Sequence, residues 1–522
     1  MTFHQSLDAT LPHGAQEPVV RFLSDPATYG QIEPIEVHST HGSLVFLTKS
    51  HAYKMKRAVR YPYMDYSTAQ RRRAMCELEL AVNRRTAPQL YESVMSIVPW
   101  SEGFRLGLAE EEGAVEWVVV MKRFRQEDLL EQRRRAGVLT LADMTAVGEA
   151  IAAFHQSAEV TRSFGGIAGL REVVEENIAM LRDAADVLSP ALAAQYAQAS
   201  EQWLRRLRAK LGWRRITGMV RRCHGDLHLN NICLMGGKPL LFDAIEFDDA
   251  FANIDTGFDL AFLLMDLDSH GMRPHANAVL NRYLERTRDY DVLGVLPLLL
   301  ATRAALRAHI AVAKHRVHAE EDGVPPQALL ERALEYLHPP KPMLVAIGGL
   351  SGSGKSTVAA LAAPMVGAAP GAVVLRTDVI RKAMFGVSET TRLNDSAYDE
   401  ATTASVYDEL NRLAVQALHA GHSVIADAVF GAAHQRAHIQ AAAFQAGVSF
   451  RGIWLTAPRP VLEARLAARK GDASDADAAV LAKQLAAIAD PDDWHHVENA
   501  RAAPSPDSVL AHLRMDPVRC AA

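Results

Sequence analysis

The sequence predicts an α+β domain followed by an α/β domain that is built on a parallel sheet. Residues 30–125 consist of short apolar or alternating runs, whereas residues 140–336 carry apolar side chains at three- and four-residue steps. Three prolines then fall within four residues, at 339–342. Beyond them apolar strands alternate with helical stretches, which is typical of a parallel sheet with both faces covered.

These changes in apolar periodicity and proline content define the expected domain boundaries. We expect a first domain over residues 1–338, with a strand-rich lobe at about 30–122 and a helical lobe at about 123–338. Residues 339–342 form a proline-rich linker, because proline cannot continue a helix and favours an extended backbone. The second domain is expected over residues 343–515.

Composition and charge exclude several classes of protein. The 56 Lys and Arg residues nearly balance the 61 Asp and Glu residues, so the broad basic field of a duplex-binding protein is missing. No apolar run approaches the roughly 18 residues of a membrane span, and the N-terminus shows no secretory signal. The four cysteines (Cys76, Cys223, Cys233 and Cys520) show no paired spacing. We therefore expect a cytoplasmic protein without structural zinc or disulfides that binds neither nucleic acid nor membrane; its oligomeric state stays open.

The strand-rich lobe contains five expected strands and one expected helix. The strands are expected at 35–38, 44–48, 52–56, 93–98 and 117–121, separated by turns rich in Gly, Ser and charged residues. The helix is expected over about 68–86, where Pro88 provides a stop signal.

The helical lobe is interrupted by one segment that does not read as helix. Two sets of apolar residues carry the helical period: Met144, Val147, Ile151 and Phe154, and Val174, Ile178, Leu181 and Leu188. Glycines and a proline break the pattern at 223–247. The apolar pieces at 232–235 and 239–242 are too short for helices, so we expect strands there.

This interrupting segment carries a catalytic pattern. Residues 224–231 read His-Gly-Asp-Leu-His-Leu-Asn-Asn and match H-x-D-x-x-x-x-N, the catalytic-loop pattern of the protein-kinase superfamily. The spacing lets Asp226 act as the catalytic carboxylate at an acceptor hydroxyl while Asn231 coordinates magnesium. Asp243 follows an apolar run and is the expected second metal ligand.

The full sequence of residues 224–231 resembles that of aminoglycoside phosphotransferases and choline kinases more than that of protein kinases. The later run Asp-Thr-Gly-Phe-Asp-Leu-Ala at 255–261 also resembles a structural segment of that family. The resemblance implies that Asp259 anchors the structure and does not catalyse. The glycine-rich cover of the family is reduced here to a single glycine, Gly42.

The same resemblance implies a lysine and a glutamate that bind the nucleotide. In this family a strand lysine binds the α- and β-phosphates and pairs with a helix glutamate. Lys54 is the favoured lysine, and Lys56 is the alternative because both lie on one face of the expected strand. Glu79 is the better-placed partner, with Glu77 as the alternate.

A phosphate-binding loop opens the second domain. Residues 349–356 match G-x-x-x-x-G-K-[ST], between an expected strand at 343–347 and an expected helix at 357–363. Glycines let successive backbone N–H groups surround phosphates at a helix N-terminus, the lysine reaches the outer phosphates and the Ser356 hydroxyl is a magnesium ligand. The expected nucleotide-binding residues are Gly349, Leu350, Ser351, Gly352, Ser353, Gly354, Lys355, Ser356 and Thr357.

Two aspartates end apolar strands of the second domain. Asp378 and Asp427 are each expected at the carboxyl edge of the parallel sheet, where ligands bind. Asp378 is the expected catalytic residue, which accepts a proton from a substrate hydroxyl. Asp427 is expected to coordinate magnesium through water. Arg381 is expected to bind the acceptor substrate. A helix-capping role is the alternative for both aspartates.

A lid is expected near the end of the second domain. Arg465 and Arg469 lie one helical turn apart and precede a segment rich in Gly, Asp and Ser at 471–477. This arrangement resembles a lid whose arginines close over the nucleotide phosphates. A solvated helix face is the alternative.

The second domain resembles the small-molecule kinase branch of phosphate-loop proteins, with similarity to gluconate-kinase-like, chloramphenicol-phosphotransferase-like and zeta-toxin-like enzymes. The chain as a whole resembles bacterial proteins in which an aminoglycoside-phosphotransferase-like domain is fused to an ATP-binding domain. The resemblance implies a kinase-like α+β fold followed by a phosphate-loop NTPase fold. It also implies ATP and Mg²⁺ at two sites.

The expected function is transfer of the γ-phosphate of ATP to hydroxyl groups of small molecules. A full set of polar catalytic residues at both sites favours two phosphotransferase activities. The alternative is that one domain is a nucleotide-binding regulator or ATPase module that gates the other. Because fold does not fix function, the sequence does not identify either acceptor.

Overall fold

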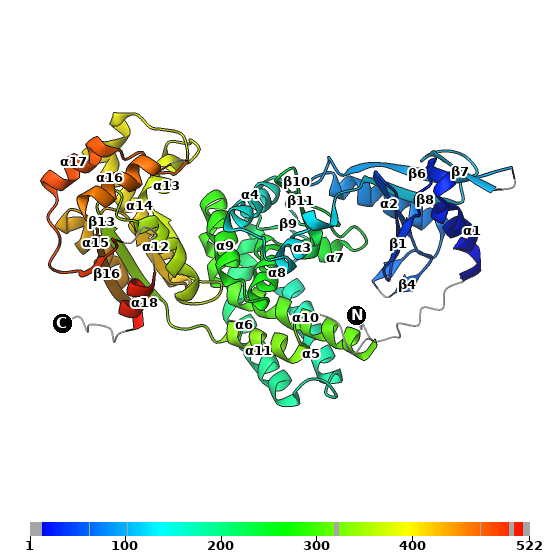
Figure 1. Cartoon of the computed structure of the whole chain (residues 1–522). Helices are drawn as coiled ribbons and strands as arrows, with labels where there is room; N and C mark the ends of the chain where they lie inside the picture. The colour runs from blue at the N-terminus through cyan, green and yellow to red at the C-terminus, as the bar shows by residue number, and fades with distance from the viewer. Residues whose placement is uncertain are drawn as a thin grey trace. The chain divides into compact units, whose positions relative to one another are not determined.

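The computed structural model describes residues 13–61, 63–101, 103–317, 323–469, 471–500 and 506–514, and its elements are labelled in Figure 1. The chain divides into two compact units. The first unit is Met1–Asp266 with Thr302–Leu330, and the second is Leu267–Ala301 with Glu331–Ala522. A segment that precedes the proline-rich linker in sequence, Leu267–Ala301, therefore groups with the C-terminal part of the chain.

The first unit begins with an antiparallel sheet of order β1-β2-β3-β8-β6-β7. Its elements are α1 (His13–Ser24), β1 (Glu36–Ser39), β2 (Ser43–Leu47), β3 (His51–Lys56), the hairpin β4 (Arg60–Tyr61) and β5 (Met64–Asp65), α2 (Ala69–Asn83), β6 (Tyr91–Trp100), β7 (Gly103–Leu108) and β8 (Glu116–Lys122). The five predicted strands and the predicted helix are confirmed to within a few residues. The helix α1 and the strand β7 were not anticipated.

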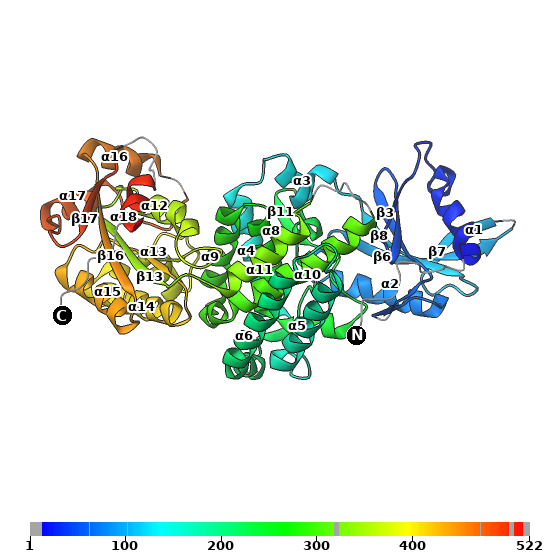
Figure 2. The ribbon, with the colours of Figure 1, turned by 90° about the horizontal axis from the view of Figure 1, so that it is seen from below.

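Alternation along β8 explains how two helices cover opposite faces of this sheet. Val118 and Val120 pack in one cluster with Val19 and Leu23 of α1. Val119 packs in a second cluster that includes α2. Successive strand side chains point to opposite faces, so one apolar strand contributes to both clusters. Helices α1 and α2 lie on opposite sides of the sheet (Figure 2).

The rest of the first unit is mainly helical. Its elements are α3 (Leu130–Arg135), α4 (Leu141–Ser157), α5 (Gly166–Asp183), α6 (Pro190–Ile216), β9 (Val220–Arg222), β10 (Ile232–Met235), β11 (Lys238–Leu241), α7 (Asp249–Ala252), β12 (Asn253–Asp255), α8 (Thr256–Ser269), α10 (Leu296–Val317) and α11 (Pro326–Leu337), of which the last three extend into the second unit. The strand predicted at 232–235 is confirmed as β10, which pairs antiparallel with β11. Leu188 lies beyond the end of α5, so the helical period is interrupted before that residue.

One helix among the described residues is long and apolar enough to cross a membrane by length and composition. Its span is Leu296–Arg316, with a mean hydropathy of 1.3 in its most apolar window. No apolar run of this length was expected from the sequence. In the structure 72% of that window is buried within the protein, which is typical of the core helix of a folded domain.

The second unit contains a five-stranded sheet of order β14-β15-β13-β16-β17, in which every pairing is parallel. Its strands are β13 (Met343–Gly349), β14 (Val373–Arg376), β15 (Val424–Asp427), β16 (Ser449–Thr456) and β17 (His495–Glu498). Its helices are α9 (Arg273–Thr287), α12 (Lys355–Ala362), α13 (Thr377–Met384), α14 (Glu400–His419), α15 (Ala433–Gln445), α16 (Arg459–Ala468), α17 (Ala478–Ala487) and α18 (Asp507–Arg514). The parallel sheet confirms the predicted fold class, and β13 confirms the strand expected before the phosphate loop.

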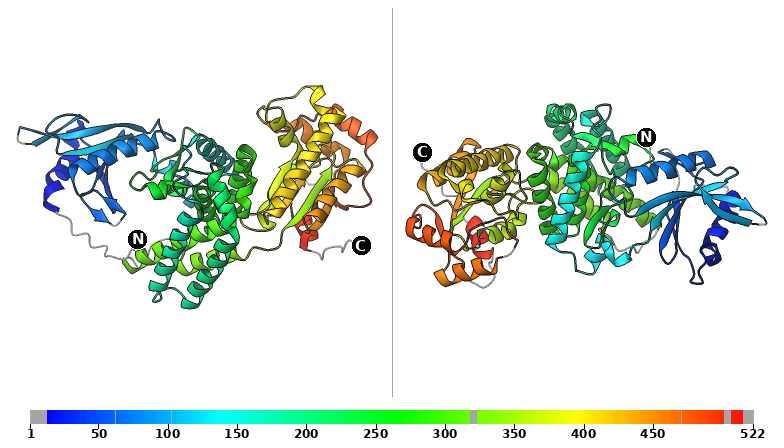
Figure 3. Two further views of the ribbon diagram at one scale, coloured as in Figure 1. Left: turned by 180° about the vertical axis from the view of Figure 1, so that it is seen from behind. Right: turned by 90° about the horizontal axis from the view of Figure 1, so that it is seen from above.

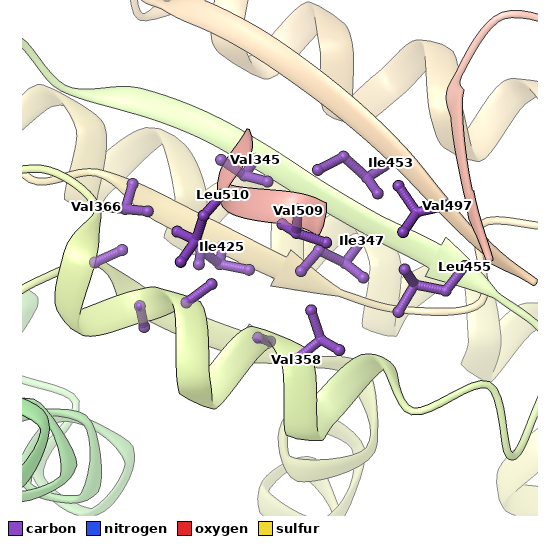
Figure 4. Packing of buried hydrophobic residues seen from close by; sticks show 14 residues of the cluster. Val345, Ile347, Val358, Val366, Ile425, Ile453, Leu455, Val497, Val509 and Leu510 are labelled. Atoms are coloured by element: carbon purple, nitrogen blue, oxygen red, sulfur yellow. The ribbon is translucent and has the colours of Figure 1, made fainter. Parts of the chain in front are cut away.

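The core of the second unit lies between this sheet and α12. Val345 and Ile347 of β13 alternate onto the same face and pack with Val358 of α12 and Val509 of α18 (Figure 4). Helices α14 and α15 pack against the strands as well. The sheet is therefore covered by helices on both faces (Figure 3).

Helix α9 covers the free edge of β14. The Asn277 Nδ2 atom donates to the carbonyl oxygen of Ala372 at 3.0 Å, and the Val374 N–H donates to Asn281 Oδ1 at 2.7 Å. These two asparagines supply the hydrogen bonds that a neighbouring strand would otherwise give to an edge strand. The strand that leads to Asp378 is thus completed by a segment that precedes the linker.

Candidate active sites

The first candidate site joins β3, α2 and the segment after β11. Lys54 Nζ lies 2.8 Å from Glu79 Oε1 and 2.5 Å from Asp243 Oδ1. Glu79 is fully buried on α2. Three of the sequence-predicted residues therefore meet, although Lys54 and Asp243 are 189 positions apart.

Lys56, the alternative lysine, binds the other side of the same glutamate. Its Nζ lies 2.5 Å from Glu79 Oε2 and also forms an ion pair with Glu246. Burial lowers the pKa of Lys56, but the charges of Glu246 and Glu79 outweigh burial and hold the pKa well above its usual range. The pKa of Lys54 is also raised, because Asp243 and Glu79 outweigh the effect of its burial. Both lysines are therefore cationic.

The hairpin β10–β11 brings the two expected metal ligands together. Asn231 ends a short 3₁₀ turn immediately before β10. Its carbonyl oxygen accepts from the N–H of Phe242, the residue before Asp243, at 3.0 Å. Asn231 Nδ2 donates to Asp226 Oδ2 at 2.9 Å, which leaves the amide oxygen Oδ1 as its ligand atom. An amide oxygen beside a carboxylate is the hard-oxygen donor set that suits Mg²⁺.

The Asp226 carboxylate is held between polar partners and is 41% exposed. His228 Nε2 lies 3.3 Å from Asp226 Oδ2. Burial raises the pKa of Asp226, but the charges of His228 and Arg303 contribute to a larger opposing effect, and the pKa falls below its usual range. The carboxylate is therefore ionised and can accept a hydrogen bond from a hydroxyl group.

Asp259 fixes the backbone of the catalytic segment. Its carboxylate accepts from the N–H groups of His224 at 3.0 Å and Gly225 at 2.8 Å, and it also contacts His155 Nε2 at 3.0 Å. The two N–H groups belong to the two residues that immediately precede Asp226, so Asp259 holds the backbone that leads into that residue. This geometry agrees with the anchoring function that the family resemblance implies.

The second candidate site is a cleft of about 1180 Å³ at the phosphate loop. The loop leads from β13 into α12, which begins at Lys355. A Cβ atom on Gly349 would lie 2.5 Å from Leu455 O, and one on Gly352 would lie 2.7 Å from Leu462 O. Only glycine fits this cradle of backbone N–H groups, so the loop fits a nucleotide phosphate.

Residues of the loop differ in what they present to the cleft. Lys355 Nζ donates to Leu350 O at 3.1 Å, inside the loop. Burial lowers the pKa of Lys355, although Asp427 and Asp378 oppose this effect. Ser356 and Thr357 both line the cleft.

Asp378 and Asp427 both line this cleft. Asp427 is the last residue of β15 and stands opposite Arg376 of β14. Asp378 lies in the first turn of α13, two residues after β14 ends, so its placement at the end of the strand needs a small correction. Burial and the charge of Asp427 raise the pKa of Asp378, while Arg376 and Lys355 partly oppose them.

The predicted arginines contact protein groups as well as the cleft. Arg381 Nη1 donates to Ala397 O at 2.5 Å, so the protein already fixes its guanidinium. Arg465 donates to Ser353 O at 3.2 Å and to Asn499 O at 2.9 Å, and thereby supports the loop from its carbonyl side. Arg469 follows the last residue of α16 and lines the cleft.

Four further residues shape the sites and were missed by sequence reasoning. Arg376 lies 3.4 Å from Asp427 and 2.8 Å from Asp472. Gln484 Oε1 accepts from the Ser351 N–H at 2.8 Å. The other two residues, Glu246 and Tyr66, belong to the first site. A signal existed only for Glu246, an acidic residue three positions after Asp243.

Comparison with known proteins places the chain in a family. Over 477 residues the chain is 31% identical to the uncharacterized protein Rv2004c of Mycobacterium tuberculosis, covering 89% of this chain and 92% of that protein. The chain belongs to the family of that protein. The uncharacterized protein Mb2027c of Mycobacterium bovis matches it to the same extent.

Two family models match successive parts of this family member. The phosphotransferase enzyme family matches residues 56–296, and an AAA domain matches residues 344–491. The predicted fusion of a phosphotransferase-family domain with a phosphate-loop domain is therefore confirmed. Nucleotide binding and phosphotransfer are the general activities that these domains support.

Solved structures are similar to parts of the chain. A choline/ethanolamine kinase family protein from Mesorhizobium loti is 13% identical, with a TM-score of 0.35, covering 61% of this chain and 92% of that one. A sugar kinase from Janibacter sp. HTCC2649 is 21% identical, with a TM-score of 0.25, covering 33% and 92%. A gluconokinase from Sinorhizobium meliloti 1021 is 23% identical, with a TM-score of 0.23, covering 33% and 91%.

Proposed function

We propose that this family member is an Mg²⁺- and ATP-dependent phosphotransferase with two active sites. Each site transfers the γ-phosphate of ATP to a hydroxyl group of a small molecule. The observation that carries the proposal is the same at both sites. A catalytic carboxylate, a phosphate-binding lysine and a carboxylate suited to a metal occur together in each unit.

In the first site Lys54 binds the phosphates and Asp226 receives the acceptor. The acceptor oxygen attacks the γ-phosphorus, the bond from that phosphorus to the β–γ bridging oxygen breaks, and ADP leaves. The hydroxyl proton passes to Asp226, whose carboxylate is ionised and 41% exposed. Asn231 and Asp243 would hold Mg²⁺, which offsets negative charge on the phosphates when bound.

In the second site the loop amides and Lys355 bind the phosphates, and Asp378 receives the proton of the acceptor hydroxyl. The raised pKa of Asp378 makes its carboxylate a stronger base than a solvated aspartate. Ser356 and Asp427 would hold Mg²⁺ there. Arg381 lines the acceptor side of the cleft, and Arg469 lines the cleft as a phosphate partner.

The test uses the full chain with γ-labelled ATP and a panel of sugars, amino sugars and nucleosides. The near balance of charged residues supports small molecules over nucleic acid as acceptors. Asp226→Asn and Asp378→Asn are assayed separately and together. Labelled product that persists in the double variant at the parent rate would contradict the proposal.

A second candidate function is that the phosphate-loop domain gates the first site. The Ser351 N–H, a loop amide that is expected to face phosphate, donates to Gln484 Oε1. This side chain therefore competes with a nucleotide phosphate for the amide. Under gating, Lys355→Ala changes the rate of transfer at the first site. Under two independent activities, Lys355→Ala abolishes only the transfer that depends on Asp378.

A further inference from the structure

Two lysines and three carboxylates form one chain of ion pairs in the first unit. Lys54 links Asp243 to Glu79, with distances of 2.5 Å and 2.8 Å. Lys56 links the other oxygen of Glu79, at 2.5 Å, to Glu246. Both ends of the chain are therefore carboxylates on the same short segment, Asp243 to Glu246.

The two ends of this chain differ in their access to solvent. The Lys54 side chain is 13% exposed and that of Asp243 is 43% exposed. The Lys56 and Glu246 side chains are only 2% and 5% exposed. A nucleotide and a cation can therefore approach the Lys54 end, whereas the Lys56 end is enclosed by protein.

Tyr66 closes the enclosed end. Its hydroxyl donates to Glu246 Oε1 at 2.9 Å, and its ring centroid lies 5.2 Å from Lys56 Nζ. Tyr66 is itself buried, and its carbonyl oxygen accepts from Arg72 at 2.9 Å. A buried, hydrogen-bonded ion pair of this kind loses much if one partner alone is removed.

Binding of Mg²⁺ and ATP at this site requires the exposed end to open. The phosphates compete for Lys54 and the cation competes for Asp243, so the ion pair between these two residues cannot persist unchanged. Asp243 also has a φ of +62°, a left-handed backbone conformation that aspartate adopts less readily than glycine. Its neighbours must therefore hold this segment when Lys54 turns to the phosphates.

We propose that Lys56 and Glu246 are positioning residues that keep Asp243 in place for the metal while Lys54 binds the nucleotide. This inference rests on the proposed function of the first site. The two lysines then have different functions: Lys54 binds the phosphates, and Lys56 holds the segment that carries the metal ligand. Glu79 connects the two.

The experiment measures binding, in full-length protein that carries Lys355→Ala to weaken nucleotide binding at the second site. ATP is titrated calorimetrically at a series of MgCl₂ concentrations, beginning with none. Glu246→Gln should leave metal-free ATP affinity close to that of the parent and raise the Mg²⁺ concentration that half-saturates the response by about 10- to 100-fold, the usual effect of losing a group that orients a metal ligand. Lys54→Met should lower ATP affinity with and without Mg²⁺.

A paired substitution separates positioning from stability. Lys56→Met with Glu246→Leu removes one buried positive and one buried negative charge, and Glu79 keeps its ion pair with Lys54. Apolar replacement of both charges of a buried ion pair usually preserves folding. We expect this double variant to unfold near the parent temperature and to keep the weakened Mg²⁺ response. Recovery of the parent Mg²⁺ response would overturn the positioning role.

The outcomes distinguish this inference from the proposed function. A Lys355→Ala parent that binds no ATP would overturn both the first active site and the positioning role. A parent that binds ATP with an Mg²⁺ response unchanged by Glu246→Gln would overturn the positioning role alone. An equal loss of ATP affinity with and without Mg²⁺ in Glu246→Gln would also overturn it.

Discussion

Asp226 and Asp378 are proposed for the same task in surroundings that shift their pKa values in opposite directions. The pKa of Asp226 is lowered because neighbouring groups that include His228 and Arg303 outweigh burial. The pKa of Asp378 is raised by burial and then by the charge of Asp427. Asp378 therefore has a carboxylate among the neighbours that shift its pKa, whereas the neighbours that shift the pKa of Asp226 are histidines and an arginine.

Neighbouring groups therefore adjust the pKa of one residue type, aspartate, in two different ways. Because its pKa is lowered, Asp226 remains ionised over a wide pH range and can accept the acceptor proton, as proposed, throughout that range. Asp378 holds a proton more readily once the acceptor releases it. The two sites therefore differ in their expected pH dependence even though the bond that is broken is the same.

The largest expected effect is the loss of either carboxylate. Asp378→Asn and Asp226→Asn should each lower transfer at their own site by about 10²- to 10⁴-fold, the usual contribution of a positioned base. Nucleotide affinity should change little, because each carboxylate meets the acceptor. Labelled product and calorimetric ATP affinity check this in the full chain. Loss of transfer at the opposite site would show that the two sites are not independent.

A smaller effect is expected from the helix that completes the edge of β14. Asn277→Ala with Asn281→Ala leaves Ala372 O and Val374 N without these partners, and each unsatisfied buried group costs about 1–3 kcal/mol. Urea unfolding should show this loss in the second unit. Transfer that depends on Asp378 should fall while transfer that depends on Asp226 persists. Gln202→Ala, an exposed change on α6, is the control.

The pH profiles should separate the two sites next. A carboxylate must be ionised to accept the proton, so transfer falls as pH drops through its pKa. Because the pKa of Asp378 is raised and that of Asp226 is lowered, the acid limb for Asp378 should lie at the higher pH. Each limb is measured in the variant that lacks the other aspartate. Coincident limbs would contradict the assigned environments.

The smallest expected effect is a shift in the pH dependence of the second site when Arg376 is replaced. This guanidinium opposes the rise in the pKa of Asp378, so Arg376→Gln should move the acid limb of the second site to still higher pH. The profile of the first site serves as the internal control. A shift to lower pH would mean that Arg376 acts on Asp378 by some route other than its charge.

Local pattern was sufficient for much of the fold and for the position of both motifs. Alternation predicted β3, because successive side chains of a strand point to opposite faces. The strands β10 and β13 were predicted from short apolar runs next to glycine-rich segments. The strand β17 escaped notice because only one of its four residues is buried. The helix α9 was read as part of a helical lobe, since a helical period does not reveal which neighbour its polar residues meet.

The two candidate catalytic segments, the proline-rich linker and the order of the two fold classes could all be predicted from the sequence alone. These depend on spacing within a few residues and on backbone preferences of Gly and Pro, which are local properties. Only the tertiary structure decided that Lys54 meets Asp243, 189 positions away, while Lys56 is enclosed with Glu246. Packing alone brings such distant charges together, and burial then determines which lysine stays accessible to a nucleotide.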